Sequence, residues 1–274
     1  MSTGIERLSF NQITAERLGV GAVVDGCARA GIRYVGLWRH KVAEAGLGTS
    51  ARLVREAGLK VSSLCRGGMF TAAGPEGRRT RADDNRRAVE EAAELGAEVL
   101  VLVCGPAPDR NLGEARRVVA DALGEMVPHA QACGVRLGLE PLHPMMIGER
   151  SVVVTLAQAR GLAEALDPDW LGVIVDAYHV WWDPCLETEI AALGGRISGL
   201  HVSDWLVPTP DILAGRGMMG DGLIDLRHIR SLVDRAGYRG PVEVEIFNRD
   251  VWRLPADEVF HLVRERFARH VCNP

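Results

Sequence analysis

The chain has 274 residues, 47% hydrophobic and 25% charged, an ordinary globular composition with room for one large α/β domain or two small ones. A formal net charge of −4 gives no basic footprint for nucleic acid or an anionic membrane surface. No apolar run approaches the roughly 20 residues that cross a bilayer, and residues 1–7 lack the apolar segment of a secretory signal. Six cysteines are scattered without a C-x-x-C pair, which argues against a disulfide framework, and we expect a cytoplasmic protein.

In the first half of the chain, segments with strand character alternate with helical ones. Strands are predicted at 8–12, 34–38, 61–65 and 99–104, and the last of these is the most apolar. Helices are predicted at about 15–30, 42–57, 79–95 and 113–133. Gly31, Gly58 and Gly96 follow the first three helices as stop signals.

The second half repeats the same alternation. Strands are predicted at 135–140, 171–176, 197–202 and 242–247. Helices are predicted at about 156–166, 185–193, 226–236 and 256–270, with Asp225 as the N-cap of the third. The longest loop, 203–224, is rich in glycine and proline.

Eight strand-plus-helix units with nearly continuous apolar strands predict an α/β fold, a single-domain (β/α)8 TIM barrel over residues 1–274. A barrel of this type takes about 250 residues, which agrees with the length. A doubly wound open sheet would instead need a G-x-G-x-x-G turn after the first strand, and residues 10–14 offer none. No linker or shift in composition divides the chain.

A candidate metal-ligating residue stands at or near the end of each of the last four predicted strands. These residues are Glu140, Asp176, His201 and Glu245. The carboxyl ends of barrel strands converge on one face, so all four side chains can point into one mouth. Three carboxylates and one imidazole suit a divalent cation such as Mn²⁺, Mg²⁺, Co²⁺ or Zn²⁺. Any one acid could instead cap a helix or pair with an arginine, but four successive strand ends favour the metal site.

The same positions resemble the xylose-isomerase-like barrel superfamily of sugar isomerases and epimerases, and within it the inosose isomerases. The resemblance rests on Leu-Glu-Pro at 139–141, Asp-x-x-His at 176–179, His201, Val-Glu-Ile-Phe at 244–247, Leu-Ser-Phe-Asn at 8–11 and Gly-x-Gly-x-Ile-Asp at 220–225. It covers nearly the whole chain. The four-ligand pattern is specific for the superfamily and says little about the substrate.

The resemblance implies a metal-dependent isomerase or epimerase of a keto sugar or keto-cyclitol. Manganese is the first expectation for the metal, with magnesium, cobalt and zinc as the others. Glu140 and Glu245 would also flank the substrate as the acid/base pair. One proton is removed beside a carbonyl and returned to a neighbouring carbon or to the opposite face, through a metal-stabilised enediolate.

Other residues are expected at the rim of the same mouth. The resemblance implies that His179 touches substrate oxygens and that Arg216 binds the substrate. His143 could be an additional base or could hydrogen-bond its own loop. Arg66 and Arg39 end the third and second predicted strands and should line the pocket, as should Trp38. The simpler alternative for each charged residue is a solvated loop position or a structural ion pair, and the same applies to Arg39.

Other functions on this scaffold were weighed against the residues. Endonuclease IV needs extra histidine ligands at the ends of strands two, three and four, whereas strand three here ends on Arg66. A lyase of the inosose dehydratase or 3-keto-glycoside deglycosylase type would use the same metal and first base, with His143 or His179 as acid, and stays open. The expected partner is a small sugar or cyclitol, with neither nucleic acid nor membrane. A homo-oligomer is compatible with the sequence, although nothing marks an interface.

Overall fold

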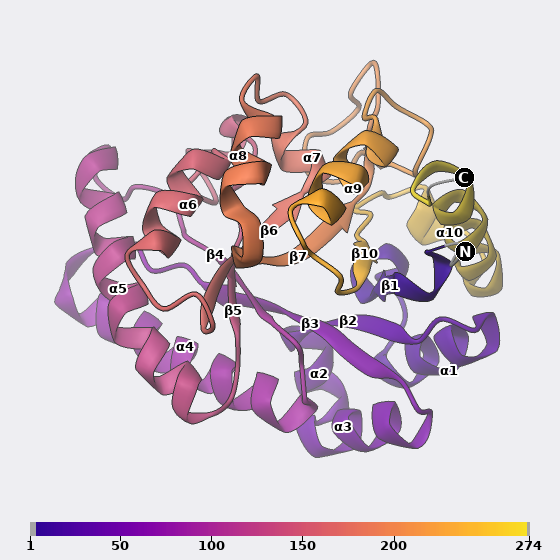
Figure 1. The fold of residues 1–274 in the computed structure, drawn as a ribbon. Coiled ribbons are helices and arrows are strands. Elements are labelled where there is room, and N and C mark those ends of the chain that lie inside the picture. The colour runs from indigo at the N-terminus through magenta and orange to yellow at the C-terminus, as the bar shows by residue number, and fades with distance from the viewer. Residues whose placement is uncertain (1–3, 273–274) are drawn as a thin grey trace.

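Eight parallel strands close into a barrel in the computed structural model, which describes residues 4–272 (Figure 1). In chain order the barrel strands are Leu8–Asn11 (β1), Tyr34–Trp38 (β2), Lys60–Gly68 (β3), Leu100–Val103 (β4), Leu137–Leu139 (β5), Leu171–Asp176 (β6), Ile197–Val202 (β7) and Val242–Val244 (β10). Around the barrel the order is β1-β10-β7-β6-β5-β4-β3-β2. Each barrel strand therefore pairs with the barrel strands that come before and after it in the chain, and β1 pairs with β10 to close the ring. The predicted (β/α)8 barrel is confirmed.

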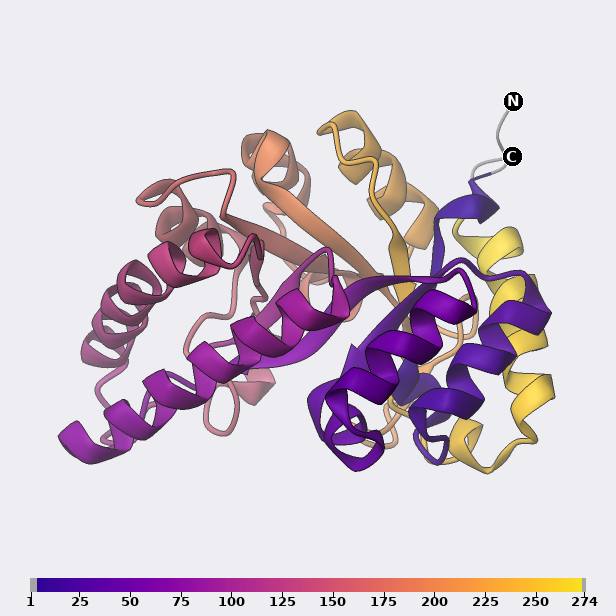
Figure 2. The ribbon, with the colours of Figure 1, turned by 90° about the horizontal axis from the view of Figure 1, so that it is seen from below.

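Helices surround the barrel, as the views from two directions show (Figures 1 and 2). The longer ones are Val20–Ala30 (α1), Leu47–Glu56 (α3), Gly74–Leu95 (α4), Leu112–Ala132 (α5), Leu156–Glu164 (α6), Leu186–Leu193 (α8), Leu226–Arg235 (α9) and Ala256–His270 (α10). Their apolar faces bury against the sheet, which is why the barrel strands are apolar on both sides. No helix within residues 4–272 is long and apolar enough to cross a membrane.

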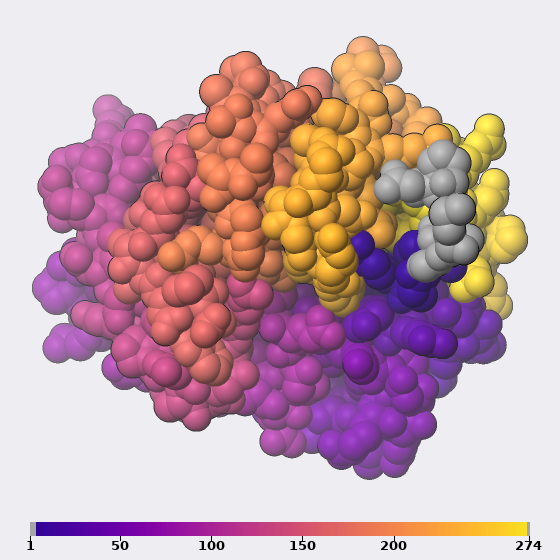
Figure 3. Space-filling model, viewed as in Figure 1, coloured from indigo at the N-terminus to yellow at the C-terminus, as the bar shows by residue number. Residues whose placement is uncertain are grey.

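The last helix closes the ring of helices beside the start of the chain. α10 packs against α1 and against the short 3-10 helix Ile5–Arg7 (η1). In the space-filling view, yellow atoms of the C-terminal region lie near indigo atoms of the first described residues (Figure 3).

The structure divides one predicted helix and lengthens another. The helix predicted over 42–57 is two helices, Arg39–Ala45 (α2) and α3, because Gly46 between them adopts a φ of 87°. α4 begins at Gly74 rather than at 79, since Pro75 fits the first turn of a helix, where its missing N–H costs nothing.

The predicted loop 203–224 contains an ordered ribbon that sequence reasoning missed. Asp204–Trp205 (β8) and Arg216–Gly217 (β9) pair antiparallel. The Asp204 carboxylate accepts hydrogen bonds of 2.9 Å from the backbone N–H groups of Gly220, Gly222 and Ile224. The Asp204 carboxylate thus satisfies three backbone N–H groups that a helix or strand would otherwise pair. The ribbon also fixes the position of Arg216.

Candidate metal centre

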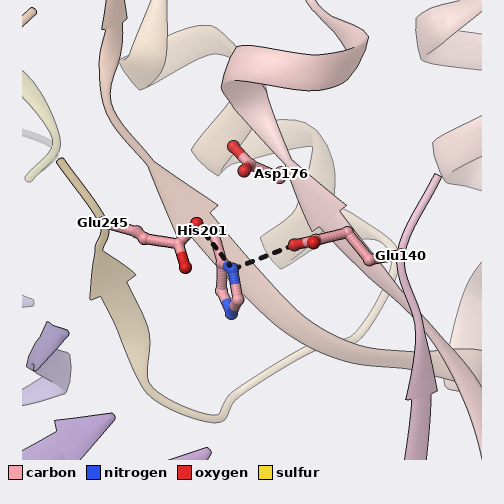
Figure 4. Close-up of side chains that lie close together, drawn as sticks. All are labelled: Glu140, Asp176, His201 and Glu245. Carbon is pink, nitrogen blue, oxygen red and sulfur yellow. Dashed lines mark ion pairs between the residues drawn. The ribbon is translucent and has the colours of Figure 1, made fainter. Parts of the chain in front are cut away.

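The four predicted ligands meet in one buried cluster (Figure 4). Glu140 follows β5, Asp176 ends β6, His201 lies in β7 and Glu245 follows β10. One ligand atom from each residue lies within 4.8 Å of the others. None of the four is more than 5% exposed.

Strand register explains this convergence. Asp176 pairs with His201 across β6 and β7, and His201 pairs with Glu243 across β7 and β10. Side chains alternate between the two faces of a strand, so Glu245, two residues beyond Glu243, also points into the barrel. The backbone N–H groups of Glu140 and Glu245 donate to the carbonyls of the neighbouring strands, at 3.0 Å and 3.1 Å.

The surroundings of this cluster raise the pKa values of two of its members, for different reasons. Burial raises the pKa of Glu245 to about 8, although Arg216 and His201 oppose the shift. Burial would lower the pKa of His201, but the charges of Glu243, Glu140 and Glu245 outweigh it and raise that pKa to about 10. Such buried negative charge calls for a cation.

The residues present fit a divalent cation. Nδ1 of His201 lies 3.2 Å from Oε1 of Glu140, yet neither atom has a hydrogen-bond partner among the described residues. Buried polar atoms rarely stay unpaired unless something else binds them. Three carboxylates and one imidazole nitrogen are the donor set of Mn²⁺, Co²⁺ or Zn²⁺ sites, and the cation would neutralise most of the acid charge.

A second buried acid, Glu243, lies beneath the cluster and was missed by the sequence analysis. Its carboxylate accepts hydrogen bonds from Asn11 at 2.6 Å, Ser62 at 2.6 Å and Ser63 at 2.8 Å. Its Oε1 lies 3.9 Å from Nε2 of His201, on the side of the ring away from the cluster. The alternation Val-Glu-Val-Glu over 242–245 was the signal, since both acids had to face the same side of β10.

Gly36 makes the space for Glu243. A Cβ at residue 36 would lie 2.2 Å from Oε1 of Glu243, closer than any real contact. We call Glu243 with Asn11, Ser62 and Ser63 the barrel floor. Asn11 also donates to Oε1 of Glu245 at 3.3 Å, so it connects the floor to the cluster.

Arg216 lies inside the site rather than on a solvated loop. It is 3% exposed, and its Nη1 lies 3.0 Å from Asp176 and 3.1 Å from Glu245. The guanidinium stacks over the rings of Tyr178 and Phe247, at 4.5 Å and 4.9 Å from their centroids. Its buried Nε has no hydrogen-bond partner among the described residues, which leaves one donor for a ligand.

His179 also faces the cluster. It lies in the four-residue helix Ala177–Val180 (α7), which Asp176 caps by accepting a hydrogen bond from the N–H of Tyr178 at 2.9 Å. Its Nδ1 accepts from the backbone N–H of His143 at 3.1 Å, so in the neutral ring the proton is on Nε2. Desolvation lowers the pKa of His179 to about 3, and the ring is therefore neutral near pH 7.

The structure gives the side chain of His143 a role in its own loop. Its Nδ1 accepts from the N–H of Met145 at 3.3 Å and caps the 3-10 helix Pro144–Met146. Its ring packs on Trp205, with centroids 4.7 Å apart, and against Trp182. Of the two roles left open by the sequence, the loop hydrogen bond is the one observed.

Two hollows that share lining residues lie at the cluster and beside it. The inner pocket, about 30 Å³, is bordered by Glu140, Glu245, His179 and Arg216. The outer hollow, about 510 Å³, shares Trp38, Cys65 and Arg66 with the inner one. Trp38 and Arg66 thus line the pocket, as the sequence predicted. A separate hollow of about 500 Å³ lies between α4 and α5 and contains none of the four ligands.

Arg39, in contrast, is a structural residue at the edge of the outer hollow. It pairs with Glu91 at 2.5 Å and with Asp84 at 3.1 Å. Lys41 pairs with Glu16 at 3.6 Å and with Glu44 at 3.8 Å and does not border the inner pocket.

Comparison with protein families and sequences identifies relatives for most of this chain. A family model described as xylose isomerase-like TIM barrel matches residues 24–266. An inosose isomerase of Halalkalibacterium halodurans is 28% identical over 166 residues, 56% of this chain and 54% of that protein. A 3-dehydroshikimate dehydratase of Pseudomonas putida is 34% identical over 164 residues, 57% of this chain and 24% of that protein. The chain spans about half the length of the first relative and about a quarter of the second.

Solved structures resemble the chain over nearly its full length. Protein SMc04130 of Sinorhizobium meliloti 1021 is 48% identical, with a TM-score of 0.96, over 98% of this chain and 100% of that one. The IolI protein with a bound zinc atom is 20% identical, with a TM-score of 0.85, over 97% of this chain and 98% of that one. At that identity the second likeness shows a shared fold.

Proposed function

Because the chain belongs to the xylose isomerase-like TIM barrel family, we propose that it is a divalent-metal-dependent isomerase or epimerase of a keto sugar or keto-cyclitol. The observation that carries the proposal is the buried cluster of Glu140, Asp176, His201 and Glu245, with two unpaired polar atoms facing each other inside it. The expected partner is a small molecule, and the expected compartment is the cytoplasm.

Those four residues would hold the cation. When bound, a divalent cation supplies Lewis-acid stabilisation for negative charge that develops on adjacent substrate oxygens. Manganese remains our first expectation, and zinc, cobalt and magnesium are the alternatives. The zinc in the IolI structure shows that this fold can carry such an ion.

Glu140 and Glu245 are the proposed proton carriers. Both carboxylates border the inner pocket, so both can reach a reacting carbon placed there. One carboxylate takes a proton from the carbon beside the carbonyl, and the electron pair moves onto the carbonyl oxygen. An isomer forms when the proton returns to the former carbonyl carbon and the hydroxyl on the first carbon gives its proton to the former carbonyl oxygen. Return of the proton to the opposite face of the first carbon gives an epimer.

His179 and Arg216 are the proposed donors to substrate oxygens. Nε2 of His179 and Nη2 of Arg216 lie 3.0 Å apart, and in the tautomer fixed by His143 both atoms are donors. An acceptor oxygen between them would relieve this close contact and satisfy both N–H groups. A hydroxyl or carbonyl oxygen of the substrate is such an acceptor.

A lyase is the second candidate, since the 3-dehydroshikimate dehydratase of Pseudomonas putida is a relative of the chain. After the same proton abstraction, a β hydroxyl would leave as water with the proton that the carboxylate removed. His179 is neutral near pH 7 and suits a hydrogen bond to the substrate better than delivery of a proton. This property favours the isomerase or epimerase.

Incubation with Mn²⁺ in D₂O, using a panel of ketoses and inososes, tests the proposal. Deuterium at one carbon, with the skeleton otherwise unchanged, supports an isomerase or epimerase. Loss of water or of an aglycone supports the lyase instead. Absence of any metal-dependent exchange or conversion across the panel would contradict both.

A further inference from the structure

We propose that the substrate carries an anionic group, a carboxylate or a phosphate, and that Arg66 and Arg150 bind it beside the candidate metal centre. This inference rests on the proposed function, because it assumes that the hydroxyketone part of the substrate sits at the cluster. It adds a substrate class and a second binding element to that site.

Arg66 is a half-buried guanidinium without an acidic partner among residues 4–272. It borders both the inner pocket and the outer hollow. Desolvation lowers its pKa, and so do its charged neighbours Arg150, Arg81 and Arg39. A guanidinium surrounded by like charge is a costly arrangement that an anion would relieve.

Arg150 reaches the same inner pocket from the loop after β5. It follows the 3-10 helix Pro144–Met146, borders the inner pocket and forms no ion pair within the described part of the chain. Its backbone is held at both ends, since its N–H donates to Met146 at 2.9 Å and its carbonyl accepts from Gly105 at 2.8 Å. The guanidinium is therefore presented from a fixed backbone position.

The end of β3 holds Arg66 in a similar way. Asn85 of α4 accepts a hydrogen bond from the N–H of Gly68 at 2.6 Å and donates to its carbonyl at 2.9 Å. A Cβ at residue 68 would lie 2.1 Å from the carbonyl oxygen of Val103, so the strands approach as closely as a glycine permits. Two arginines that extend from such fixed backbone positions can meet one anion at the inner pocket.

The acids that border the two hollows are all engaged elsewhere. Asp84 and Glu91 are paired with Arg39, and Glu140 and Glu245 belong to the cluster. A bound divalent cation together with Arg216 would balance the three carboxylates of the cluster. Arg66 and Arg150 then remain as two positive charges with no counter-ion, and arginine forms paired hydrogen bonds with both carboxylate and phosphate.

Two matched pairs of probes test this inference by calorimetric titration of the Mn²⁺-loaded protein. The first pair is 3-dehydroshikimate and its neutral methyl ester, and the second is ribulose 5-phosphate and ribulose. Charge-assisted hydrogen bonds to a partly buried anion should make at least one anionic probe bind about 10- to 100-fold more tightly than its neutral counterpart. The pair that shows the preference tells a carboxylate from a phosphate.

The double variant Arg66→Gln/Arg150→Gln should bring that ratio to about one while retaining Mn²⁺ binding. A matched control is Arg86→Gln/Arg117→Gln, which removes the same charge from exposed pairs on α4 and α5 and should keep the ratio. Equal binding within both pairs, preference for the neutral probes, a ratio that survives in the double variant, or no binding of any probe would overturn the inference.

Turnover of the ketose and inosose panel is measured separately on the same preparations. Metal-dependent turnover without a preference for anions would overturn this inference and leave the proposed function intact. Preference for anions without any turnover would overturn the proposed function and would leave anion binding by Arg66 and Arg150 supported.

Discussion

Glu243 and Glu245 lie two residues apart on one side of the barrel, and their surroundings differ sharply. Glu243 accepts hydrogen bonds from an amide and two hydroxyl groups of the barrel floor. Glu245 faces two other carboxylates and an imidazole, and burial raises its pKa to about 8. The comparison separates two kinds of buried acid. Glu243 is satisfied by neutral donors, whereas Glu245 lies between Arg216 and the other cluster residues, and we propose that it binds a cation and carries a proton.

The largest expected effect follows from substituting Glu245. Glu245→Gln removes a proposed metal ligand and proposed proton carrier while keeping the side-chain shape. We expect turnover to fall by about 10²- to 10⁴-fold or more. Steady-state kinetics on the substrate found in the D₂O panel, with circular dichroism as the check on folding, would measure this. Near-normal turnover in a folded variant would show that Glu245 carries no proton.

Glu243→Gln should affect metal binding indirectly, through its neighbour His201. Loss of the charge beside Nε2 of His201 should weaken the orientation and basicity of this proposed ligand, and such changes typically cost about 10- to 100-fold in metal affinity. Mn²⁺ titration measures the effect. Glu187→Gln is the matched control, since this exposed acid pairs with His228 far from the cluster. Equal metal affinity in both variants would mean that the barrel floor is structural only.

Gly36→Ala should disturb the floor without altering any polar group. The added Cβ would overlap the Glu243 carboxylate, and overpacking of this kind costs about 1–3 kcal/mol in the free energy of unfolding. Denaturant unfolding measures the loss. Gly21→Ala is a suitable control, because a Cβ at residue 21 would meet only an ordinary contact with Leu53 at 3.7 Å. An equal change in both variants would contradict the close fit around Glu243.

The smallest expected effect concerns Arg39, the paired arginine at the hollow that Arg66 also borders. A hydrogen bond from Arg39 lowers the pKa of Asp84, so this pair stabilises the fold above the unfolded pKa of about 3.9 and loses its contribution as the pH falls below it. Arg39→Gln should therefore cost about 0–1 kcal/mol at pH 7. Urea unfolding at pH 7 and pH 3 should show the difference shrinking at the lower pH, and growth of the difference would contradict this sign.

The sequence predicted the barrel, and it predicted that Glu140, Asp176, His201 and Glu245 would lie at one mouth, because the carboxyl ends of parallel barrel strands converge on one face. The family that their motifs suggested is confirmed by the match over residues 24–266. Trp38 and Arg66 were likewise placed correctly at the pocket, since both end predicted strands. Strand ends are thus the positions at which sequence and site agree best.

Residues inside strands and loops were harder to predict. Glu243 was hidden because its position within β10 shows only in the alternation with Glu245. The position of Arg150 depends on how the loop after β5 folds back. In that loop Ser151 forms a parallel β-bridge with Gly105. Arg216 was located by resemblance, but its burial depends on the β8–β9 ribbon and on Asp204, a tertiary arrangement that no local pattern predicts.

The central claim is that Glu140, Asp176, His201 and Glu245 together form one metal site. Mn²⁺ binding followed by electron paramagnetic resonance tests it most directly, with Asp176→Asn as the comparison. The account predicts one tightly bound ion per chain in the unaltered protein and weak or no binding in the folded variant. Absence of stoichiometric binding to the unaltered protein, or equally tight binding to the variant, would contradict it.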